Sequence, residues 1–305
     1  MNNTILISGI FGFIGSHLAD TLMDLGYNVI GVDDMSKGDP ANLKYHPKVF
    51  VRDINDNLDD IFKEFRPEYV YNLAAFIDLR KSFITPLDCF DTNVLGSINL
   101  ITTAVKYKVK KFIFSSTGGA IYSDSILPFT EYSNALPASP YGLSKLTIER
   151  YLEIVNKTNG LNYVNLRFGN VFGPRQDPMG EAGVISIFLD KILKNKPITI
   201  FGDGKQTRDY VFVKNIISAC VLALDSNIVG TLNVGSGVEK SVNDIVAELQ
   251  KHFDFEINYS PAIPGEMLRS VLNSNKLKNL GWKPKYTFEQ GLNETIKYFK
   301  EKNRK

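Results

Sequence analysis

The stretch that decides the fold is Ile5-Leu6-Ile7-Ser8-Gly9-Ile10-Phe11-Gly12-Phe13-Ile14-Gly15, close to the start of a 305-residue chain. Its first four residues predict a buried strand, and its glycines predict a tight turn that leads directly into a helix. Gly9 permits the turn, Gly12 lets the backbone approach a pyrophosphate, and Gly15 lets helix and strand pack closely. The exposed amides at the start of the helix, where Phe13 and Ile14 lie, then face the anion. The stretch therefore predicts a dinucleotide-binding unit.

An acidic residue ends the second predicted strand, Asn28–Asp33, and supports this interpretation. Asp33 stands at the distance expected for a carboxylate that binds the adenosine ribose hydroxyls, and Asp34 follows it. Because a carboxylate there repels a 2′-phosphate, the sequence favours NAD over NADP as cofactor. The chain has no GxxxxGK[ST] motif, which disfavours a Walker-type nucleotide hydrolase.

Short apolar runs alternate with amphipathic stretches over the first 170 residues, as in a parallel sheet covered by helices. Several of these runs are almost continuous in Val, Ile, Phe and Tyr, as in strands buried on both faces. The further predicted strands are Lys48–Val51, Tyr69–Ala74, Lys111–Ser115 and Tyr163–Phe168. The predicted helices are Gly12–Leu25, Asn57–Phe65, Pro86–Tyr107 and Ser139–Asn156.

The pattern changes after Phe172, where glycines and prolines interrupt the alternation. A helix over Val184–Leu193, a strand over Ile198–Phe201, two later helices and a frayed tail at Lys300–Lys305 are predicted there; the later helices are Val242–Phe253 and Leu292–Lys302. Thr231–Val234 is expected to return to the main sheet. We predict an α/β fold with a Rossmann-type doubly wound parallel sheet in residues 1–172, returning near 209–236. A smaller, discontinuous α/β substrate domain is predicted in 173–208 and 237–305.

Composition excludes several classes of function. The 35 basic and 33 acidic side chains nearly balance, so nucleic acid and an anionic membrane surface are not expected partners. No apolar run approaches the roughly 20 residues that span a bilayer, and the first strand leaves no room for a signal peptide. Cys89 and Cys220 lack CxxC spacing and are expected to be buried, reduced thiols of a cytoplasmic protein. The three widely spaced histidines predict no metal site.

Tyr141 and Lys145 are four residues apart and therefore share one face of a predicted helix. Tyrosine ordinarily ionises near pH 10, so a base near neutrality needs a shift of about three units, or about 4 kcal/mol. A neighbouring ammonium and a cationic nicotinamide ring together supply that preference. Ser116 and Thr117 follow a predicted strand, where their hydroxyls could bind a substrate oxygen. These four residues are the predicted catalytic set.

In this order, the glycine-rich turn, the hydroxyl residues after a strand and the YxxxK motif resemble the extended short-chain dehydrogenase/reductase family. The segments FIFSSTGGAIY (112–122), SPYGLSK (139–145), NVFGPRQDPMGEAGV (170–184) and IFGDGKQTRDYVFV (200–213) look closest to UDP-glucose 4-epimerases. The resemblance implies that Tyr141 is the base, that Lys145 holds it and the nicotinamide ribose, and that Thr117 or Ser116 binds the sugar 4-oxygen.

The resemblance also implies binding residues elsewhere in the chain. Further cofactor contacts would be Asp53 and Ile54 at the adenine, Leu73, Ala74 and Ala75 at the inner wall, and Asn93 and Phe168. The nucleotide-sugar side would be lined by Asn170, Val184, Phe201, Arg208, Tyr210 and Ser270. Arg208 would bind the diphosphate, because its planar donors match phosphate oxygens. Ser270 falls near the position that limits sugar size, and a small residue there would admit an N-acetyl group.

The implied activity is NAD-dependent 4-epimerisation of a UDP-hexose, UDP-glucose/UDP-galactose or their N-acetylhexosamine forms, through a 4-keto sugar. The resemblance also implies a homodimer built on Pro86–Tyr107 and Ser139–Asn156. The alternatives are a nucleotide-sugar 4-ketoreductase, an epimerase of a non-UDP sugar, and a dinucleotide-sensing regulator. The intact Thr117, Tyr141 and Lys145 weigh against the regulator.

Several residues depart from the patterns of related enzymes. Gly118 and Gly119 stand where the related 4,6-dehydratases carry an Asp-Glu pair, which removes the acid and base for loss of water. Ile10-Phe11 replaces a small pair in the glycine turn, Phe76 replaces a polar residue, and Ser123 replaces a glycine. Ile263 and Leu268 stand where epimerases commonly carry arginines. Arg269 or Arg175 would have to compensate for them at the diphosphate, or the substrate is an unusual nucleotide sugar.

Overall fold

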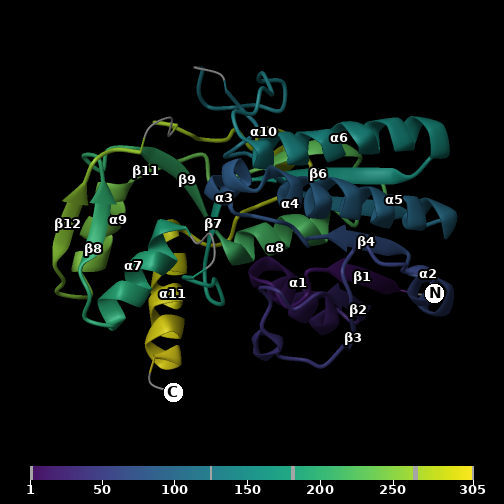
Figure 1. The fold of residues 1–305 in the computed structure, drawn as a ribbon, viewed down its shortest axis with the longest axis horizontal. Helices are drawn as coiled ribbons and strands as arrows, with labels where there is room; N and C mark the ends of the chain where they lie inside the picture. Colours follow the sequence, from purple (N-terminus) through teal and green to yellow (C-terminus); the bar gives the residue numbers. More distant parts are fainter. Residues whose placement is uncertain (1–2, 124–125, 180–182, 264–266, 304–305) are drawn as a thin grey trace.

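The structure, a computed structural model, describes residues 3–123, 126–179, 183–263 and 267–303. Within them, seven parallel strands form the main sheet, in the order β10-β6-β5-β4-β1-β2-β3 (Figure 1). The strands are β1 (Thr4–Ser8), β2 (Asn28–Asp33), β3 (Lys48–Val51), β4 (Tyr69–Asn72), β5 (Lys111–Thr117), β6 (Asn162–Phe168) and β10 (Gly230–Val234). The chain runs outward in opposite directions from β1 and β4, so the strand order reverses there. Ligands of such sheets bind beyond the carboxyl ends of the strands at this point.

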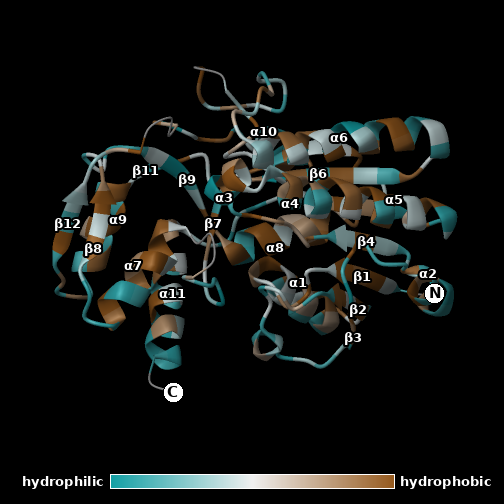
Figure 2. Ribbon diagram, in the orientation of Figure 1, coloured by the Kyte–Doolittle hydropathy of each residue, from teal (hydrophilic) through white to brown (hydrophobic). Residues whose placement is uncertain are grey.

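Two helical layers cover the sheet because its strands are apolar on both faces. Ile5 and Ile7 of β1 face the layer that contains α1 (Phe13–Asp24) and α8 (Val213–Leu222), while Leu6 faces the opposite layer. The opposite layer contains α2 (Asp59–Phe65), α5 (Ser97–Lys106) and α6 (Pro140–Asn159). Figure 2 shows hydrophobic residues gathered in the central sheet and in α8. The predicted α/β fold with a doubly wound parallel sheet is confirmed.

The rest of the chain forms two small sheets with their own helices, at the left of Figure 1. One sheet has the order β11-β9-β7, and the other pairs β12 with β8. The strands are β7 (Asn170–Phe172), β8 (Ile198–Phe201), β9 (Thr207–Phe212), β11 (Glu239–Ser241) and β12 (Ile257–Ser260). The helices of this part are α7 (Val184–Leu193), α9 (Val242–Gln250) and α11 (Phe288–Lys302), while α10 (Asn275–Asn279) packs against β10 of the main sheet. Thr231–Val234 lies in the main sheet, as predicted, beside β6.

Several predicted elements have other bounds in the structure; α11, for example, begins at Phe288 and not at Leu292. The single helix predicted over Pro86–Tyr107 is divided into α4 (Pro86–Phe90), a π-helical segment η2 (Asp91–Gly96) and α5. The strand predicted to reach Ala74 ends at Asn72: the Leu73 amide still donates to the Ser8 carbonyl of β1, but the Ala74 amide donates to the Ser8 side chain. The strand predicted to end at Ser115 continues to Thr117 along β6.

The predicted frayed tail is wrong for Lys300–Lys302, which complete α11; residues 304–305 lie outside the described part of the chain. Phe299 is buried against the core, and the Asn303 side chain donates to the Leu193 carbonyl, so packing extends the helix. The helix α3 (Leu79–Ile84) was not predicted as a separate element; Asp78 caps it by accepting from the Lys81 amide. Both cysteines are buried thiols, as expected.

Candidate active site

The turn after β1 has the geometry that its glycines predict. Gly9 has φ +71°, and a Cβ on it would lie 2.7 Å from the Ala74 amide nitrogen. A Cβ on Gly15 would lie 2.0 Å from the Gly9 carbonyl oxygen, so only glycine lets α1 approach the turn this closely. Gly12 is the N-cap of α1, and no side chain caps the helix there. The turn thus leaves the first amides of α1, at Phe13 and Ile14, to an anion.

The two large residues of the turn pack beneath it. Ile10 is fully buried against Gly31 of β2, where a Cβ on Gly31 would lie 2.6 Å from an Ile10 methyl. Phe11 is 7% exposed and lies beside Gly38. Their size is therefore accommodated by glycines on the neighbouring chain, and it does not crowd the predicted pyrophosphate site.

Asp33 lies at the carboxyl end of β2, within reach of the same turn. Its two oxygens accept from the Phe11 and Met35 amides, each at 2.9 Å. Burial raises the pKa of the carboxyl, and it is 6% exposed. Each oxygen keeps a lone pair for a ribose hydroxyl. Asp34 is exposed and accepts from the Ser36 amide and hydroxyl, so it faces solvent.

The other predicted cofactor residues lie along neighbouring strand ends. Ser8 supports Leu73 and Ala74 through their amides, and its own hydroxyl donates to Asn72 Oδ1 at 2.8 Å. Ile54 is buried beside Gly96, and Asp53 accepts from the Asn55 amide. Ala75 is half-buried, and Phe168 ends β6 with 6% exposure. Contact of these residues with a cofactor stays a prediction.

Asn93 has a different setting from the one predicted. It is 1% exposed, and its amide group binds the Phe76 backbone through both ends. It also donates to the Ser144 hydroxyl at 2.9 Å. The side chain thus ties the segment after β4 to α6, and Ser144 lies between Tyr141 and Lys145. Its polar atoms are thus engaged by protein, and its contact with the cofactor stays a prediction.

Tyr141 and Lys145 lie on one face of α6, near its start. Ser139 caps the helix by accepting from the Gly142 amide, and Pro140 occupies the first position. Lys145 Nζ donates to the Ser115 carbonyl at 3.0 Å and lies 6.0 Å from the centroid of the Tyr141 ring. Burial lowers the pKa of Lys145 to about 8, against the opposing fields of Cys89 and Glu149. An ammonium is thus held beside the phenol by the end of β5.

Thr117 and Ser116 lie on opposite faces of β5, because side chains alternate along a strand. Thr117 accepts from the Gly119 amide, and a Cβ on Gly119 would lie 3.5 Å from Asn170 Oδ1. Ser116 is 4% exposed and donates to the Glu149 carboxylate at 2.5 Å. The Ser116 hydroxyl is thus engaged within the protein, and the half-buried Thr117 is the better placed of the two to bind a substrate oxygen, which stays a prediction.

The predicted nucleotide-sugar residues come from several elements. Asn170 and Val184 are half-buried at the starts of β7 and α7, and Phe201 is 38% exposed at the end of β8. Arg208 lies on β9 and donates to the Thr207 carbonyl, while Tyr210 is 6% exposed. Ser270 is 2% exposed and its amide donates to the Thr207 carbonyl, next to Arg208. The β7–β9 pairing sets Asn170 directly beside Tyr210.

The two arginines that could replace the missing ones are held by carboxylates. Arg269 binds Glu239 through two nitrogens, at 3.0 and 2.5 Å. Arg175 binds Asp20 at 2.8 Å. Leu268 is exposed and Ile263 is half-buried. Both arginines are thus already engaged with carboxylates, and we expect the predicted diphosphate site to depend mainly on Arg208.

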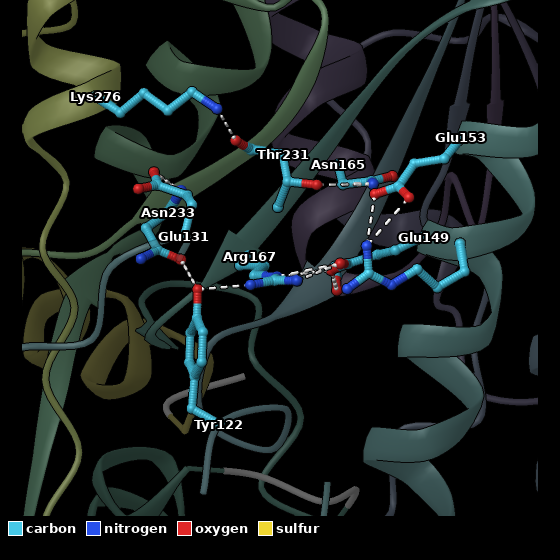
Figure 3. Close-up of polar contacts among 11 residues, drawn as sticks. Tyr122, Glu131, Glu149, Glu153, Asn165, Arg167, Thr231, Asn233 and Lys276 are labelled. Atoms are coloured by element: carbon cyan, nitrogen blue, oxygen red, sulfur yellow. Dashed lines mark hydrogen bonds and ion pairs between the residues drawn. The ribbon is translucent and has the colours of Figure 1, made fainter. Parts of the chain in front are cut away.

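A buried polar network that was not predicted from the sequence lies beside the predicted catalytic residues. Glu149 on α6 binds Arg167 on β6, and Arg167 also donates to the Tyr122 hydroxyl (Figure 3). The pattern that could have revealed it is an arginine inside the apolar strand Asn162–Phe168, together with a glutamate four residues after Lys145. Charged residues are almost never fully buried unless they are paired.

The fold and this site together define a Rossmann-type, dinucleotide-dependent enzyme. A model of the NAD dependent epimerase/dehydratase family matches residues 5–235. The chain belongs to this family.

Several proteins that are similar to this chain are named UDP-glucose 4-epimerases. A putative UDP-glucose 4-epimerase of Methanocaldococcus jannaschii is 41% identical, over 98% of this chain and 99% of that protein. A UDP-glucose 4-epimerase of Thermotoga maritima, solved with UDP-glucose, is 42% identical with a TM-score of 0.95, over 98% of this chain and 99% of that one. A UDP-glucose 4-epimerase of Thermus thermophilus, solved with NAD, is 37% identical with a TM-score of 0.93, over 97% and 99%. The predicted family is confirmed.

Proposed function

We propose that the protein is an NAD-dependent UDP-hexose 4-epimerase, an isomerase. The observation that carries the proposal is the meeting of two elements at one place. Helix α6 presents Tyr141 with the buried ammonium of Lys145 beneath it, and the end of β5 both binds that ammonium and presents Thr117. Family membership and the resemblance to enzymes solved with UDP-glucose and with NAD support the same conclusion.

The residues of the chain fit NAD. The glycine turn, the uncapped start of α1 and the buried Asp33 offer a pyrophosphate site and a ribose site in the expected order. Lys145 would hold the nicotinamide ribose. When bound, NAD accepts a hydride from C4 of the sugar and returns it, which is chemistry that no side chain supplies.

The side chains manage the proton and the orientation of the sugar. Thr117 binds the 4-oxygen, and Tyr141 as phenolate removes the 4-hydroxyl proton while C4 loses its hydride. The Lys145 ammonium stabilises the phenolate. The 4-keto sugar then turns about its link to the diphosphate, and Tyr141 returns the proton as hydride returns to the other face. The cycle is balanced, because one proton and one hydride leave and return.

The proposal extends to the residues that would bind the nucleotide sugar. Arg208 binds the diphosphate and Phe201 contacts the nucleotide, while Asn170, Val184, Tyr210 and the small Ser270 surround the sugar. UDP-glucose and UDP-galactose are the first candidates, which would give the enzyme a place in galactose metabolism. Ser270 extends the candidates to N-acetylhexosamines. We also propose the division into 1–172 with 209–236, and 173–208 with 237–305, as cofactor and substrate domains. At the boundaries, β7 and most of β9 lie within the first set of ranges but pair with each other in the small sheet, so Asn170 and Tyr210 face the substrate side.

The competing activity is a one-way 4-ketoreductase, which consumes a reduced cofactor. Purified enzyme separates the two. An epimerase interconverts UDP-glucose and UDP-galactose without added cofactor and releases NAD on denaturation. A reductase leaves both sugars unchanged and oxidises NAD(P)H in proportion to a keto substrate; that result would contradict the proposal.

A homodimer is also proposed, because apolar side chains remain exposed on two helical elements that pack together. They lie on α4 with its π-helical continuation and on α6. The side chains are Leu87, Leu95, Leu143 and Ile154, each 47–83% exposed. We expect the wild type to sediment as a dimer and Leu87→Glu/Leu143→Glu to sediment as a monomer. A monomeric wild type contradicts the proposed dimer.

None of the described helices is long and apolar enough to cross a membrane. We propose a cytoplasmic location.

A further inference from the structure

A buried network of polar side chains connects α6, which carries Tyr141 and Lys145, with β6, β10 and the segment that follows Thr117. Arg167 on β6 forms two bonds to Glu149 through Nε and Nη2, with the shorter one 2.5 Å long. Its remaining nitrogen, Nη1, donates to the Tyr122 hydroxyl at 2.8 Å, and that hydroxyl donates to Asn233 on β10 at 2.7 Å. Figure 3 shows this continuous chain of contacts from α6 to β10. All of these side chains are at most 3% exposed.

The network reaches each catalytic residue through a neighbour. Glu149 lies four residues after Lys145, one turn along α6, and accepts from Ser116, which precedes Thr117. Tyr122 ends the segment that follows Thr117. Within that segment Ala120 touches α6, because a Cβ on Gly142 would lie only 2.1 Å from the Ala120 carbonyl oxygen. Gly142 is the residue after Tyr141, so the segment and the helix cannot shift independently.

Stability does not explain this network well. A buried ion pair gains little over apolar side chains of similar size, because both charges must leave water. Its geometry is instead specific, since a planar guanidinium binds a carboxylate through two parallel bonds and a hydroxyl through a third. Such a connection fixes the relative positions of the elements that carry it, and a displacement of about 1 Å in an active site can cost about 100-fold in rate.

We propose that Glu149, Arg167 and Tyr122 are positioning residues that align Thr117 with Tyr141 and Lys145. The inference rests on the proposed function. The buried side chains of the network bond to one another, and they act through Ser116, the turn of α6 after Lys145, and the segment from Gly118 to Tyr122. It should therefore affect the chemical step and leave the binding of the nucleotide sugar largely unchanged.

The test compares variants in the UDP-galactose epimerase assay, with kcat, KM and thermal midpoint measured for each. Glu149→Met/Arg167→Met replaces the pair by apolar side chains, and its Tm should stay close to the wild-type value while kcat falls about 10- to 100-fold at similar KM. Tyr122→Phe removes one hydroxyl and should lower kcat by about 3- to 10-fold. The control Leu152→Ala removes buried apolar contacts on the same helix, and should lower Tm with kcat unchanged.

The proposal is overturned if Tyr122→Phe or a folded double variant keeps wild-type kcat, or if Leu152→Ala loses kcat in step with its Tm. If the double variant does not fold, Tyr122→Phe decides alone. A wild type that is inactive on every nucleotide sugar would contradict the proposed function instead. In that case, crystal structures of the wild type and of Tyr122→Phe test the positioning role of the network. An unchanged distance between the Thr117 and Tyr141 hydroxyls in the two structures overturns it.

Discussion

The two halves of the proposed site are built in different ways. The cofactor half is centred on one continuous segment, from the turn at Gly9 to the end of β2 at Asp33, and its further predicted contacts lie at neighbouring strand ends. The sugar half uses side chains between Asn170 and Ser270, spread over β7, α7, β8 and β9 and a segment beside β9. Backbone geometry tolerates few residue types, whereas separate side chains can be exchanged one at a time. The cofactor half should therefore fail as a unit, and the sugar half should be adjustable.

The largest effect is expected where the two halves meet. Tyr141→Phe removes the proposed base, and kcat should fall about 10²- to 10⁴-fold because proton transfer is lost. NAD bound per chain should stay at the wild-type value. The matched control is Tyr132→Phe, at a tyrosine that is 90% exposed, which should behave as wild type. Near-normal turnover by the Tyr141 variant would place the base elsewhere.

Lys145→Met separates the catalytic role of the ammonium from its effect on stability. Loss of the ammonium should lower kcat about 100-fold at pH 7. Since burial lowers the Lys145 pKa from 10.5 to about 8, charging it costs the folded state up to about 3 kcal/mol below pH 8. The cost disappears as pH rises from about 8 to 10.5. In urea unfolding, the variant should have a larger free energy of unfolding than the wild type at pH 7, and a smaller advantage at pH 10. A stability difference that grows with pH contradicts this.

A pair of alanine substitutions tests the cofactor half. Gly15→Ala places a Cβ 2.0 Å from the Gly9 carbonyl, so both the fold of the turn and NAD binding should be lost. Gly12→Ala meets only that carbonyl at 3.2 Å, at an ordinary φ of −68°. It should keep the fold and weaken NAD about 10- to 150-fold, the value of one hydrogen bond to a charged group, about 1.5–3 kcal/mol. NAD binding, followed by quenching of protein fluorescence, and Tm are measured for both variants. An equal loss of Tm in Gly12→Ala and Gly15→Ala would contradict the expected difference between them.

The smallest effect is expected in the sugar half, at Ser270. A larger side chain there should exclude an N-acetyl group, so Ser270→Tyr should lower turnover of UDP-N-acetylgalactosamine relative to UDP-galactose. A size difference in a pocket is worth about 10- to 200-fold. Because Ser270 is 2% exposed, the variant should also lose some Tm through overpacking. A parallel fall in both substrates would show that Ser270 does not limit sugar size.

The sequence predicted the cofactor half better than the sugar half for a physical reason. Three glycines with fixed spacing and Asp33 at a strand end are local features, and each strand of the sheet was placed within a few residues. The choice between Thr117 and Ser116 depended on where β5 ends and which face each side chain takes, and the sequence left it open. The setting of Asn93 depended on a π-helical segment that periodicity does not reveal.

Long-range pairing accounts for the remaining differences. Arg269 and Arg175 were candidates for the diphosphate until the structure paired them with Glu239 and Asp20, which are 30 and 155 residues away. An arginine inside the apolar strand Asn162–Phe168 indicates a buried partner, but spacing does not identify Glu149 as that partner, because the two residues lie on different elements. Sequence spacing gives such contacts only within one helix or strand.

The central claim is that hydride leaves C4 and returns to C4 within one active site. UDP-galactose carrying deuterium at C4 tests it directly, in ordinary water and without added cofactor. The account predicts UDP-glucose that retains the deuterium at C4, seen by mass spectrometry and NMR. Product that has lost the label to solvent, or no product unless NAD(P)H is supplied, would contradict it.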